Sequence, residues 1–352
     1  MTPRDRLLAA LRGRPIDAVP WSCYSNLLPR GETERLLRER GMALITPVTP
    51  YIREMPHVEV LSREAREGGH AYTYRTFRTP VGAVTEKRRA EPGYGSSWIV
   101  EHMIRRPEDY AVVEFMVRDT ILHPNFEAVT ELEADLDGDG VALAWTTRSP
   151  YQQMYIEMMG LERMVLDRAD GLPDFLSLYQ AMDELAERIH RLVAQSPATL
   201  IWNPDNLTDL VAGGPTFDTH YAPYYNHVAD IAAEAGKIVV SHFDGRLASL
   251  THSIARTRLP VVEAFTPPPM GDLSVAEAKA TWPDKVVWIN FPGSVFLETP
   301  DEVRRFTREL LAEAMPGGRF VLGITENIPA GVRVEALLAL ADGVADYEGT
   351  SL

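Results

Sequence analysis

Cysteine is almost absent from this chain of 352 residues, which contains only Cys23. A single cysteine forms no intrachain disulfide, and a reducing compartment fits such a sequence. The sequence also lacks an apolar run of the roughly 20 residues that span a bilayer. The opening segment, MTPRDRLLAALRG, carries too many charges for a secretory signal. We therefore expect a cytoplasmic protein without a membrane segment.

Lysine and arginine are also scarce, with 35 basic residues against 50 acidic residues. The resulting net charge of −15 repels a phosphate backbone and an anionic membrane surface. We expect neither nucleic acid nor a membrane among the partners. The hydrophobic content of 45% and the charged content of 24% are those of a soluble globular protein.

Several nucleotide-binding and nucleophile motifs are missing. No G-x-G-x-x-G turn follows the first predicted strand, and no P-loop, G-x-S-x-G or C-x-x-C motif occurs. These absences disfavour a dinucleotide-binding open sheet, a nucleotide hydrolase and a serine nucleophile. No low-complexity tract or linker interrupts the chain, so we predict one domain over residues 1–352.

What the chain does contain is an alternation of short apolar runs and helical sequence. Eight β-like runs occur near residues 19, 43, 141, 199, 238, 261, 286 and 320, and helical sequence follows each one. Ser274 with Glu277, and the segment that opens at Thr299, are signatures of helix starts. Eight such units predict an α/β fold of the TIM (β/α)8 barrel type. A doubly wound open sheet is the competing interpretation.

The stretch from residue 58 to residue 104 breaks this alternation. Residues 70–90 alternate apolar and polar side chains around Pro80, Val81 and Gly82, which is typical of a β-hairpin. Residues 96–104 add a candidate third antiparallel strand. We interpret the stretch as an antiparallel hairpin insertion near residues 58–104. It either covers a site as a flap or has no functional role.

Ionisable residues stand at the ends of the later strands. His242 and Asp244 end the run IVVSHFDG, Glu263 lies in PVVEAF, and Glu326 lies in FVLGITENIP. Active sites of TIM barrels gather at the carboxyl ends of the strands. Carboxylates at one barrel mouth repel each other, and a divalent cation relieves the repulsion. These four residues are therefore our candidate metal ligands, and Asp244 is a candidate catalytic acid as well.

Each candidate also has a structural interpretation. His242 is alternatively a core histidine with hydrogen-bond partners, and Asp244 alternatively caps a helix that begins at Arg246. Glu263 lies inside an apolar run, where a glutamate without a partner is costly. Glu326 alternatively pairs with an arginine. Nitrogen and oxygen ligands suit Zn²⁺, which we expect first, and also Fe²⁺, Mn²⁺ or Co²⁺.

Other polar residues near the predicted mouth are candidates for substrate binding and catalysis. Asp205 either contacts substrate, supports a ligating histidine, or forms an Asx turn after Pro204. Tyr155 is a candidate for positioning the substrate together with Asp205, although its alternative role is packing. The same alternatives hold for Tyr151. The remaining substrate-binding candidates are Asn203, Asn206 and Asn290, which stand at the ends of predicted strands.

These features together resemble the uroporphyrinogen decarboxylase-like superfamily over nearly the whole chain. The similarity includes the segments TPRDRLLAALRGRPIDAVPW, TPVGAVTE, YQQMYIEMMGLERMVLD, NPDNL, AGKIVVSHFDG, EAFTPPPMGDLSVAEAK and GITENIP. The resemblance implies a TIM barrel. It also implies one of two activities, tetrapyrrole decarboxylation or zinc-dependent methyl transfer between a corrinoid protein and a thiol or methoxyl substrate.

The resemblance favours the methyltransferase branch. The decarboxylases carry an arginine-rich M-R-Q-A-G-R segment after the first strand, where this chain has WSCYSNLLPRGE. The methyltransferases carry zinc-ligating H-x-C, a glutamate on strand six and a cysteine before I-P. These motifs match His242, Asp244, Glu263 and Glu326, with an acid at each cysteine position.

Replacement of the soft thiolates favours an oxygen substrate. We therefore expect a metal-dependent methyltransferase that moves a methyl group between a small, methoxylated substrate and a corrinoid (cobalamin). The corrinoid would come on a separate partner protein, because no D-x-H-x-x-G motif occurs here. The alternatives are a metal-assisted lyase, decarboxylase or hydrolase acting on a small carboxylated substrate, and a barrel that binds a ligand without catalysis.

Overall fold

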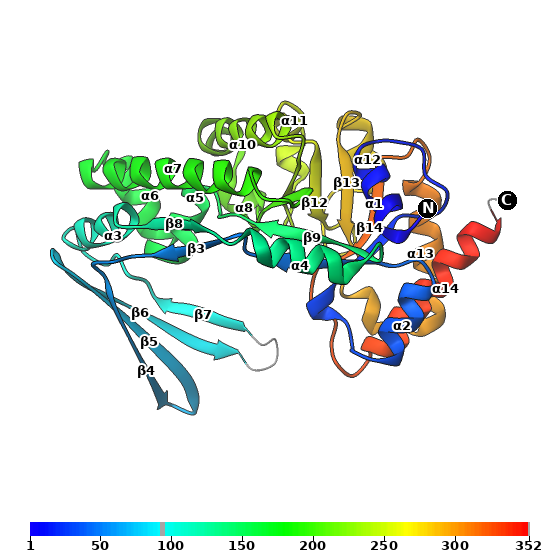
Figure 1. Ribbon diagram of the computed structural model, residues 1–352, viewed down its shortest axis with the longest axis horizontal. Coiled ribbons are helices and arrows are strands. Elements are labelled where there is room, and N and C mark those ends of the chain that lie inside the picture. Colours follow the sequence, from blue (N-terminus) through cyan, green and yellow to red (C-terminus); the bar gives the residue numbers. More distant parts are fainter. Residues whose placement is uncertain (92–95, 351–352) are drawn as a thin grey trace. The chain divides into compact units, whose positions relative to one another are not determined.

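The computed structural model describes residues 1–91 and 96–350 (Figure 1). The chain divides into two compact units. We call one the barrel unit; it comprises Met1–Pro50, Asn125–Thr146 and Val193–Leu352. We call the other the insertion unit; it comprises Tyr51–Pro124 and Thr147–Leu192. The single domain predicted over residues 1–352 stays a prediction beside this division.

Eight parallel strands within the described residues close into a barrel, which confirms the predicted TIM-type fold. Around the barrel the order is β1, β14, β13, β12, β11, β10, β9 and β2, so the first and last strands of the chain are neighbours. Each of the eight strands lies at or within a few residues of a predicted position. Their bounds are β1 Trp21–Tyr24, β2 Ala43–Val48, β9 Gly140–Trp145, β10 Leu200–Asn203, β11 Ile238–His242, β12 Val261–Phe265, β13 Val286–Asn290 and β14 Phe320–Ile324.

The barrel strands form at these positions because each is a short run of mostly apolar residues, and β-branched side chains are frequent in β11, β12 and β13. In β11, β12, β13 and β14 every residue is buried, as expected of strands that are covered on both faces. Polar side chains occur at the carboxyl ends of β10, β11 and β13, where the next residues enter loops. The barrel thereby brings the chemistry of several strands to one end.

Helices of the barrel unit begin where capping residues predict them. Ser274 and Thr299 each form a capping box with the glutamate three residues on, and Thr2 accepts a hydrogen bond from the N–H of Asp5. The α-helices are α1 Pro3–Leu11, α2 Glu32–Glu39, α4 Phe126–Leu136, α8 Asp209–Ala212, α9 Gly214–Thr216, α10 Ala222–Glu234, α11 Thr251–Ala255, α12 Val275–Thr281, α13 Pro300–Ala314 and α14 Arg333–Thr350. The shorter helical turns are η1 Ser25–Leu27, η3 Phe217–Tyr221, η4 Ala248–Leu250 and η5 Val295–Leu297.

The insertion unit contains the predicted antiparallel hairpin as part of a larger sheet. Within the described residues the sheet order is β4-β5-β6-β7, and Figure 1 shows these strands as neighbouring arrows. A two-stranded sheet of β3 and β8 accompanies it. The strands are β3 Tyr51–Glu54, β4 Glu59–Glu67, β5 His70–Thr79, β6 Gly82–Glu91, β7 Ser96–Glu101 and β8 Ile121–Pro124. The helices are α3 Asp109–Arg118, α5 Pro150–Gln153, η2 Met154–Met159, α6 Leu161–Ala169 and most of α7 Pro173–Ala194.

The sheet of the insertion unit is larger than the sequence predicts. Strand β4 was not expected, because its sequence EVLSREARE is rich in charge and exposed at nearly every position. Such a strand shows no apolar alternation, and its pairing with β5 becomes visible only in three dimensions. The predicted insertion, residues 58–104, includes residues 92–95, which lie outside the described residues. None of the helices described is long and apolar enough to cross a membrane.

Close packing within the barrel depends on two glycines in strands. A Cβ on Gly323, in β14, would overlap the carbonyl oxygen of Ile289 in β13 and would lie 2.5 Å from the indole nitrogen of Trp288. A Cβ on Gly140, in β9, would likewise overlap the carbonyl oxygen of Leu44 in β2. A clash with backbone cannot be relieved by a side-chain rotation, so the strands would have to separate.

Gly323→Ala is therefore expected to lower the free energy of unfolding by about 1–3 kcal/mol, which is the usual cost of overpacking a core. Urea denaturation followed by circular dichroism measures the effect. Gly349→Ala is the matched control, because Gly349 lies in α14 with no atom near its missing Cβ. The control should change stability by no more than about 1 kcal/mol, in the stabilising direction. Equal stability of the two variants would contradict the packing argument.

Candidate metal centre

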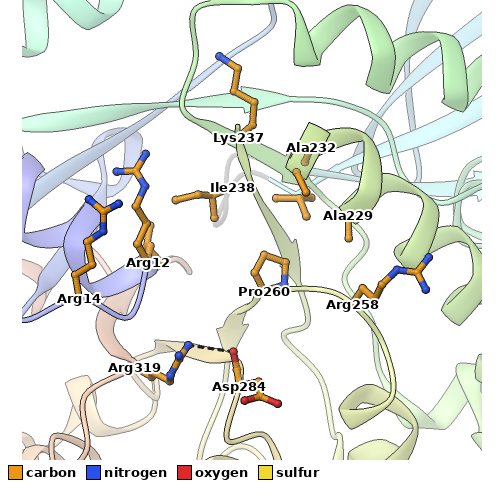
Figure 2. A pocket seen from close by; sticks show the side chains of 13 residues that line it. Arg12, Arg14, Ala229, Ala232, Lys237, Ile238, Arg258, Pro260, Asp284 and Arg319 are labelled. Atoms are coloured by element: carbon orange, nitrogen blue, oxygen red, sulfur yellow. Dashed lines mark hydrogen bonds between the residues drawn. The ribbon is translucent and has the colours of Figure 1, made fainter. Parts of the chain in front are cut away.

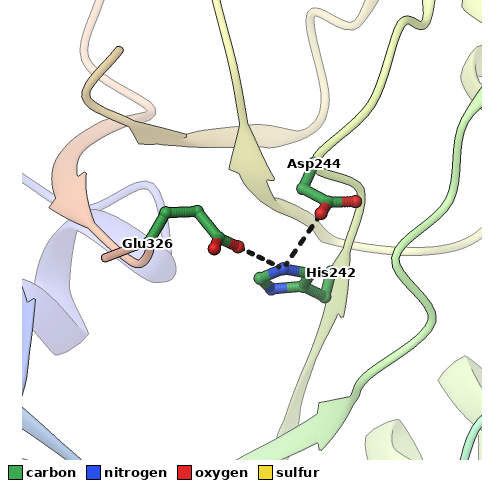
Figure 3. A group of neighbouring side chains, drawn as sticks. All are labelled: His242, Asp244 and Glu326. Atoms are coloured by element: carbon green, nitrogen blue, oxygen red, sulfur yellow. Dashed lines mark ion pairs between the residues drawn. The ribbon is translucent and has the colours of Figure 1, made fainter. Parts of the chain in front are cut away.

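Three predicted metal ligands meet at the carboxyl end of the barrel. His242 ends β11, Asp244 follows two residues later, and Glu326 lies two residues beyond β14. The ligand atoms of these side chains all lie within 4.8 Å of one another. The imidazole Nε2 lies 3.3 Å from Glu326 Oε1 and 3.9 Å from Asp244 Oδ2 (Figure 3). We call these three residues the metal group.

The barrel itself explains why residues so far apart in sequence are neighbours. In the strand order, β12 and β13 separate β11 from β14. All barrel strands run parallel, so their carboxyl ends share one mouth. Figure 3 shows Glu326 and Asp244 reaching the same ring nitrogen of His242 from different segments. The prediction that His242, Asp244 and Glu326 converge is therefore met by the structure.

Glu263, the fourth predicted ligand, contacts the opposite side of the imidazole. Its Oε2 lies 2.8 Å from Nδ1 of His242 and accepts a hydrogen bond from the indole N–H of Trp202 at 3.0 Å. Its Oε1 accepts a hydrogen bond from the hydroxyl of Tyr24 at 2.8 Å. Both carboxylate oxygens thus have partners, and Glu263 lies outside the metal group. A direct metal bond from Glu263 stays a prediction; the contacts that it makes are those that orient a ligating imidazole.

A backbone irregularity accompanies Glu263. His242 and Glu263 are register neighbours in the parallel pair β11 and β12. The register between β12 and β13 then shifts between Glu263 and Phe265, and Ala264 has a φ of +59°. A positive φ is uncommon for a residue with a side chain, and bulges occur preferentially beside active sites. The irregularity in β12 comes directly after the residue that holds the imidazole.

The charges of the site favour a bound cation. Burial alone disfavours a charged imidazole, but the neighbouring Glu263, Glu326 and Asp244 raise the pKa of His242 to about 10. Burial raises the pKa of Asp244, and burial together with the charge of Glu263 raises the pKa of Tyr24 well above its usual value. One imidazole and two carboxylates, with no thiolate, fit a divalent cation of the kind that oxygen and nitrogen ligands prefer. Such a cation would replace the proton that His242 otherwise holds.

The contacts of Asp244 differ from those expected of a helix cap, which is its alternative role. Its Oδ2 accepts a hydrogen bond from the side-chain amide of Asn206 at 2.9 Å. The acid that contacts the turn after Arg246 is Asp272. Its Oδ1 accepts hydrogen bonds from the N–H groups of Leu247 and Ala248. Asn206, a predicted substrate-binding residue, thus holds a side chain of the metal group.

The other polar candidates of the barrel unit are buried among protein partners. Asp205 accepts a hydrogen bond from the hydroxyl of Tyr225 at 2.6 Å. The side-chain oxygen of Asn203 accepts one from the hydroxyl of Tyr224, while its amide nitrogen is buried without a partner in the part of the chain described. The side-chain oxygen of Asn290 accepts a hydrogen bond from the N–H of Thr325. The predicted contacts of Asp205, Asn203 and Asn290 with substrate stay predictions.

Tyr151 and Tyr155 belong to the insertion unit. The hydroxyl of Tyr151 accepts a hydrogen bond from Arg168 at 3.2 Å, and that of Tyr155 accepts one from Gln152 at 2.9 Å. Tyr151 lies in α5 and Tyr155 in the π-helical turn η2. Their predicted roles toward substrate stay predictions.

Sequence reasoning missed the aromatic residues that surround Glu263. Tyr24 ends β1 and Trp202 lies in β10, so each follows an apolar run and resembles a core residue in sequence. The ring of Trp202 meets those of His242, Tyr24 and Trp145 edge-on, with centroid distances of 5.5, 5.9 and 4.5 Å. Their place at the carboxyl ends of barrel strands, the same as that of His242, is the signal that would have found them.

Comparison with known proteins shows the fold. No protein-family model and no curated protein sequence matches the chain. A solved methyltransferase from Methanosarcina mazei is similar with a TM-score of 0.58 and 13% identity, over 99% of each chain. A B12-independent methionine synthase from Shewanella sp. W3-18-1 gives a TM-score of 0.42 with 9% identity, over 91% of this chain and 87% of the other. A pneumococcal exo-β-D-N-acetylglucosaminidase module gives 0.42 with 10% identity, over 93% and 84%. At 13% identity the likeness to the Methanosarcina protein is one of fold.

Binding of Zn²⁺ tests the metal group directly. We expect the wild-type protein to bind one Zn²⁺ ion per chain in calorimetric titration, and His242→Gln to bind it more than about 100-fold more weakly, since even outer partners of a metal ligand contribute about 10–100-fold. His57→Gln is the matched control, because His57 pairs with Asp119 on an exposed surface of the insertion unit. Binding that is equal in the two variants would rule out the metal group as the site.

Glu263→Gln separates orientation from ligation. The amide would offer one acceptor oxygen where Tyr24, Trp202 and His242 now find two, so the imidazole would lose its fixed tautomer. We expect about 10–100-fold weaker Zn²⁺ binding with an unchanged coordination number, read from the visible absorption of bound Co²⁺. The control is Glu34→Gln, another buried glutamate, which lies in α2. A Co²⁺ spectrum that reports the loss of a ligand would instead make Glu263 a direct ligand.

Proposed function

We propose that this protein is a metal-dependent methyltransferase that moves a methyl group between a small, methoxylated substrate and a corrinoid. The observation that carries the proposal is the metal group: one imidazole, held by Glu263, faces two acids at the mouth of a TIM barrel. The resemblance to the decarboxylase-like superfamily supports it, since His242, Glu263, Asp244 and Glu326 stand at the positions of the zinc-binding motifs. The solved methyltransferase adds that this barrel is compatible with such an activity.

The two acids support the choice of an oxygen substrate. Asp244 and Glu326 stand where thiolates occur in the motifs that this chain resembles. Carboxylate ligands leave the cation a harder Lewis acid than thiolates do, and a hard Lewis acid interacts best with oxygen. When bound, the metal would polarise the ether oxygen of the substrate and so make the methyl group easier to transfer. A methoxyl group fits that chemistry better than a thioether.

The exposure of the metal group leaves room for a substrate. The side chain of His242 is 5% exposed, that of Asp244 is 25% exposed, and that of Glu326 is 45% exposed. The imidazole is thus fixed inside the barrel, while the carboxylates border solvent. Catalytic metal sites keep such an open position for a substrate atom, whereas structural sites are closed by four protein ligands.

In this proposal, residues of the chain hold the metal ligands in place and orient the substrate. Glu263 fixes the imidazole so that Nε2 faces the metal group, and Asn206 holds Asp244. We further propose that Asp205 and Tyr155 position the substrate, with Tyr151, Asn203 and Asn290 as further contacts. A separate corrinoid protein in the cytoplasm is the proposed partner, and Zn²⁺ is the proposed metal.

Methyl transfer to free cob(I)alamin tests this function. The Zn²⁺-loaded protein, a methoxylated phenol and cob(I)alamin should give methylcobalamin, measured by absorbance, as the O–CH3 bond breaks, a Co–CH3 bond forms and the phenolate takes up a proton. His242→Gln should reduce the rate by more than about 100-fold, because transition-state stabilisation by a metal is worth several kcal/mol. His57→Gln should retain the rate. Formation of no methylcobalamin from a panel of methoxylated donors would contradict the proposal.

A metal-assisted hydrolase or lyase is the second candidate. The observation that favours it is the same oxygen-rich donor set, because carboxylates and imidazole also serve metal sites that activate water. The two candidates differ in their need for cobalamin. Zn²⁺-dependent conversion of a carboxylated or ester substrate in the absence of cobalamin would favour this second function.

A further inference from the structure

The barrel unit has a pocket at the end of the strands opposite to the metal group. The pocket has a volume of about 390 Å³. Ile238 opens β11, while Pro260, Asp284 and Arg319 precede β12, β13 and β14 by one or two residues. The metal group follows the carboxyl ends of these strands, so this pocket lies at their amino-terminal ends. We call it the base pocket; Figure 2 shows its lining.

The base pocket gathers positive charge in a strongly acidic protein. Its lining contains one acid, Asp284, and five cationic residues, which are Arg12, Arg14, Lys237, Arg258 and Arg319. The chain as a whole has 50 acidic and 35 basic residues. The charge of the base pocket is therefore opposite to that of the protein that surrounds it.

Four of the five cations have no acidic partner within residues 1–91 and 96–350; of these, Lys237 donates to the backbone carbonyl of Ser196 at 2.8 Å. Arg258 forms a two-bond pair with Asp230, at 2.7 and 2.6 Å, and lies apart from the other arginines in Figure 2. Arg319 donates to the backbone carbonyl of Asp284 at 3.1 Å. For Arg12 and Arg14, no side-chain hydrogen bond or ion pair exists within residues 1–91 and 96–350. Arg12, Arg14 and Arg319 form what we call the arginine cluster.

Gly13 brings the arginine cluster together. It has a φ of +61°, and a Cβ at this position would lie 2.9 Å from the guanidinium carbon of Arg319. The absence of a side chain therefore lets the guanidinium of Arg319 lie against the turn that carries Arg12 and Arg14. Like charges that are gathered in this way repel one another, and a bound anion removes the repulsion.

The floor of the base pocket is apolar. Ala229 and Ala232 come from α10, and Ile238 and Pro260 complete the surface. In Figure 2 the cationic side chains stand around these residues. Small-molecule sites combine such an apolar surface with a few polar groups that fix orientation, and their volumes begin at about 300 Å³.

We propose that the base pocket binds a small molecule that carries a phosphate group and an apolar body. The arginine cluster contacts the phosphate, because guanidinium groups match the geometry of phosphate oxygens with paired hydrogen bonds. The apolar body lies on the floor formed by Ala229, Ala232 and Ile238. This site is separate from the metal group, and the proposal does not depend on the methyltransferase function.

Calorimetric titration with phenyl phosphate and with inorganic phosphate, at constant ionic strength, tests the site. We expect phenyl phosphate to bind at least about tenfold more tightly than inorganic phosphate, since its ring covers the apolar floor. Arg14→Gln and Arg319→Gln should each weaken phenyl phosphate binding at least about tenfold, because each removes a charge-assisted hydrogen bond. Zn²⁺ titration and thermal melting of each variant verify that the barrel is intact.

Arg308→Gln is the matched control. Arg308 is an exposed arginine of α13 without an ion pair among the described residues, and it lies outside the base pocket. The substitution Arg308→Gln removes the same charge from the protein as Arg14→Gln does, and it should leave the binding of phenyl phosphate unchanged. Equal weakening by Arg308→Gln and Arg14→Gln would overturn the proposal, since the effect would be one of net charge. Binding of phenyl phosphate no tighter than that of inorganic phosphate would overturn the role of the floor.

Discussion

The hydrogen bond between Glu263 and Nδ1 of His242 is the contact on which the site depends. A buried glutamate is costly without partners, and here the indole of Trp202 and the hydroxyl of Tyr24 also donate to it. With both oxygens occupied, Glu263 has little freedom to move, and Nδ1 keeps its proton. Nε2, which faces Asp244 and Glu326, is then the nitrogen that would give up its proton to a cation. The tautomer of His242 thus determines whether Nε2 can bind a cation together with Asp244 and Glu326.

The barrel supplies this arrangement through its register. His242 and Glu263 are adjacent because β11 and β12 pair in parallel, and the register with β13 shifts immediately afterwards, at Ala264. Glu326 reaches the imidazole from the loop after β14, which β12 and β13 separate from β11 in the closed sheet. Gly323 allows β14 to approach β13 closely just before Glu326. Packing that looks purely structural therefore places a carboxylate of the site.

Much of this was predictable from sequence, and the reasons differ between residues. The barrel strands were visible because they are apolar runs that end abruptly, and the ionisable residues at those ends identified the metal group. The sequence did not show that Glu263 contacts Nδ1 of His242. The positions of both residues on neighbouring strands predict that they lie close together, but do not predict which atoms form a hydrogen bond. Tyr24 and Trp202 were missed because an aromatic side chain in a buried strand reads as core. Strand β4 was missed because its side chains are charged and exposed, so its pairing leaves no periodic signal.

The two ends of the barrel gather side chains of opposite charge. At the carboxyl end, acids gather around one imidazole, and burial raises the pKa of one of them, Asp244. At the amino-terminal end, Gly13 and the adjacent turn gather arginines that have no acidic partner within residues 1–91 and 96–350. In a folded protein, uncompensated like charges cost stability, and a bound ligand of opposite charge offsets that cost. The same parallel strands connect the two clusters, so each end is suited to a ligand that the other would repel. This separation of charge along one barrel is the strongest physical reason to assign a cation to the mouth and an anion to the base.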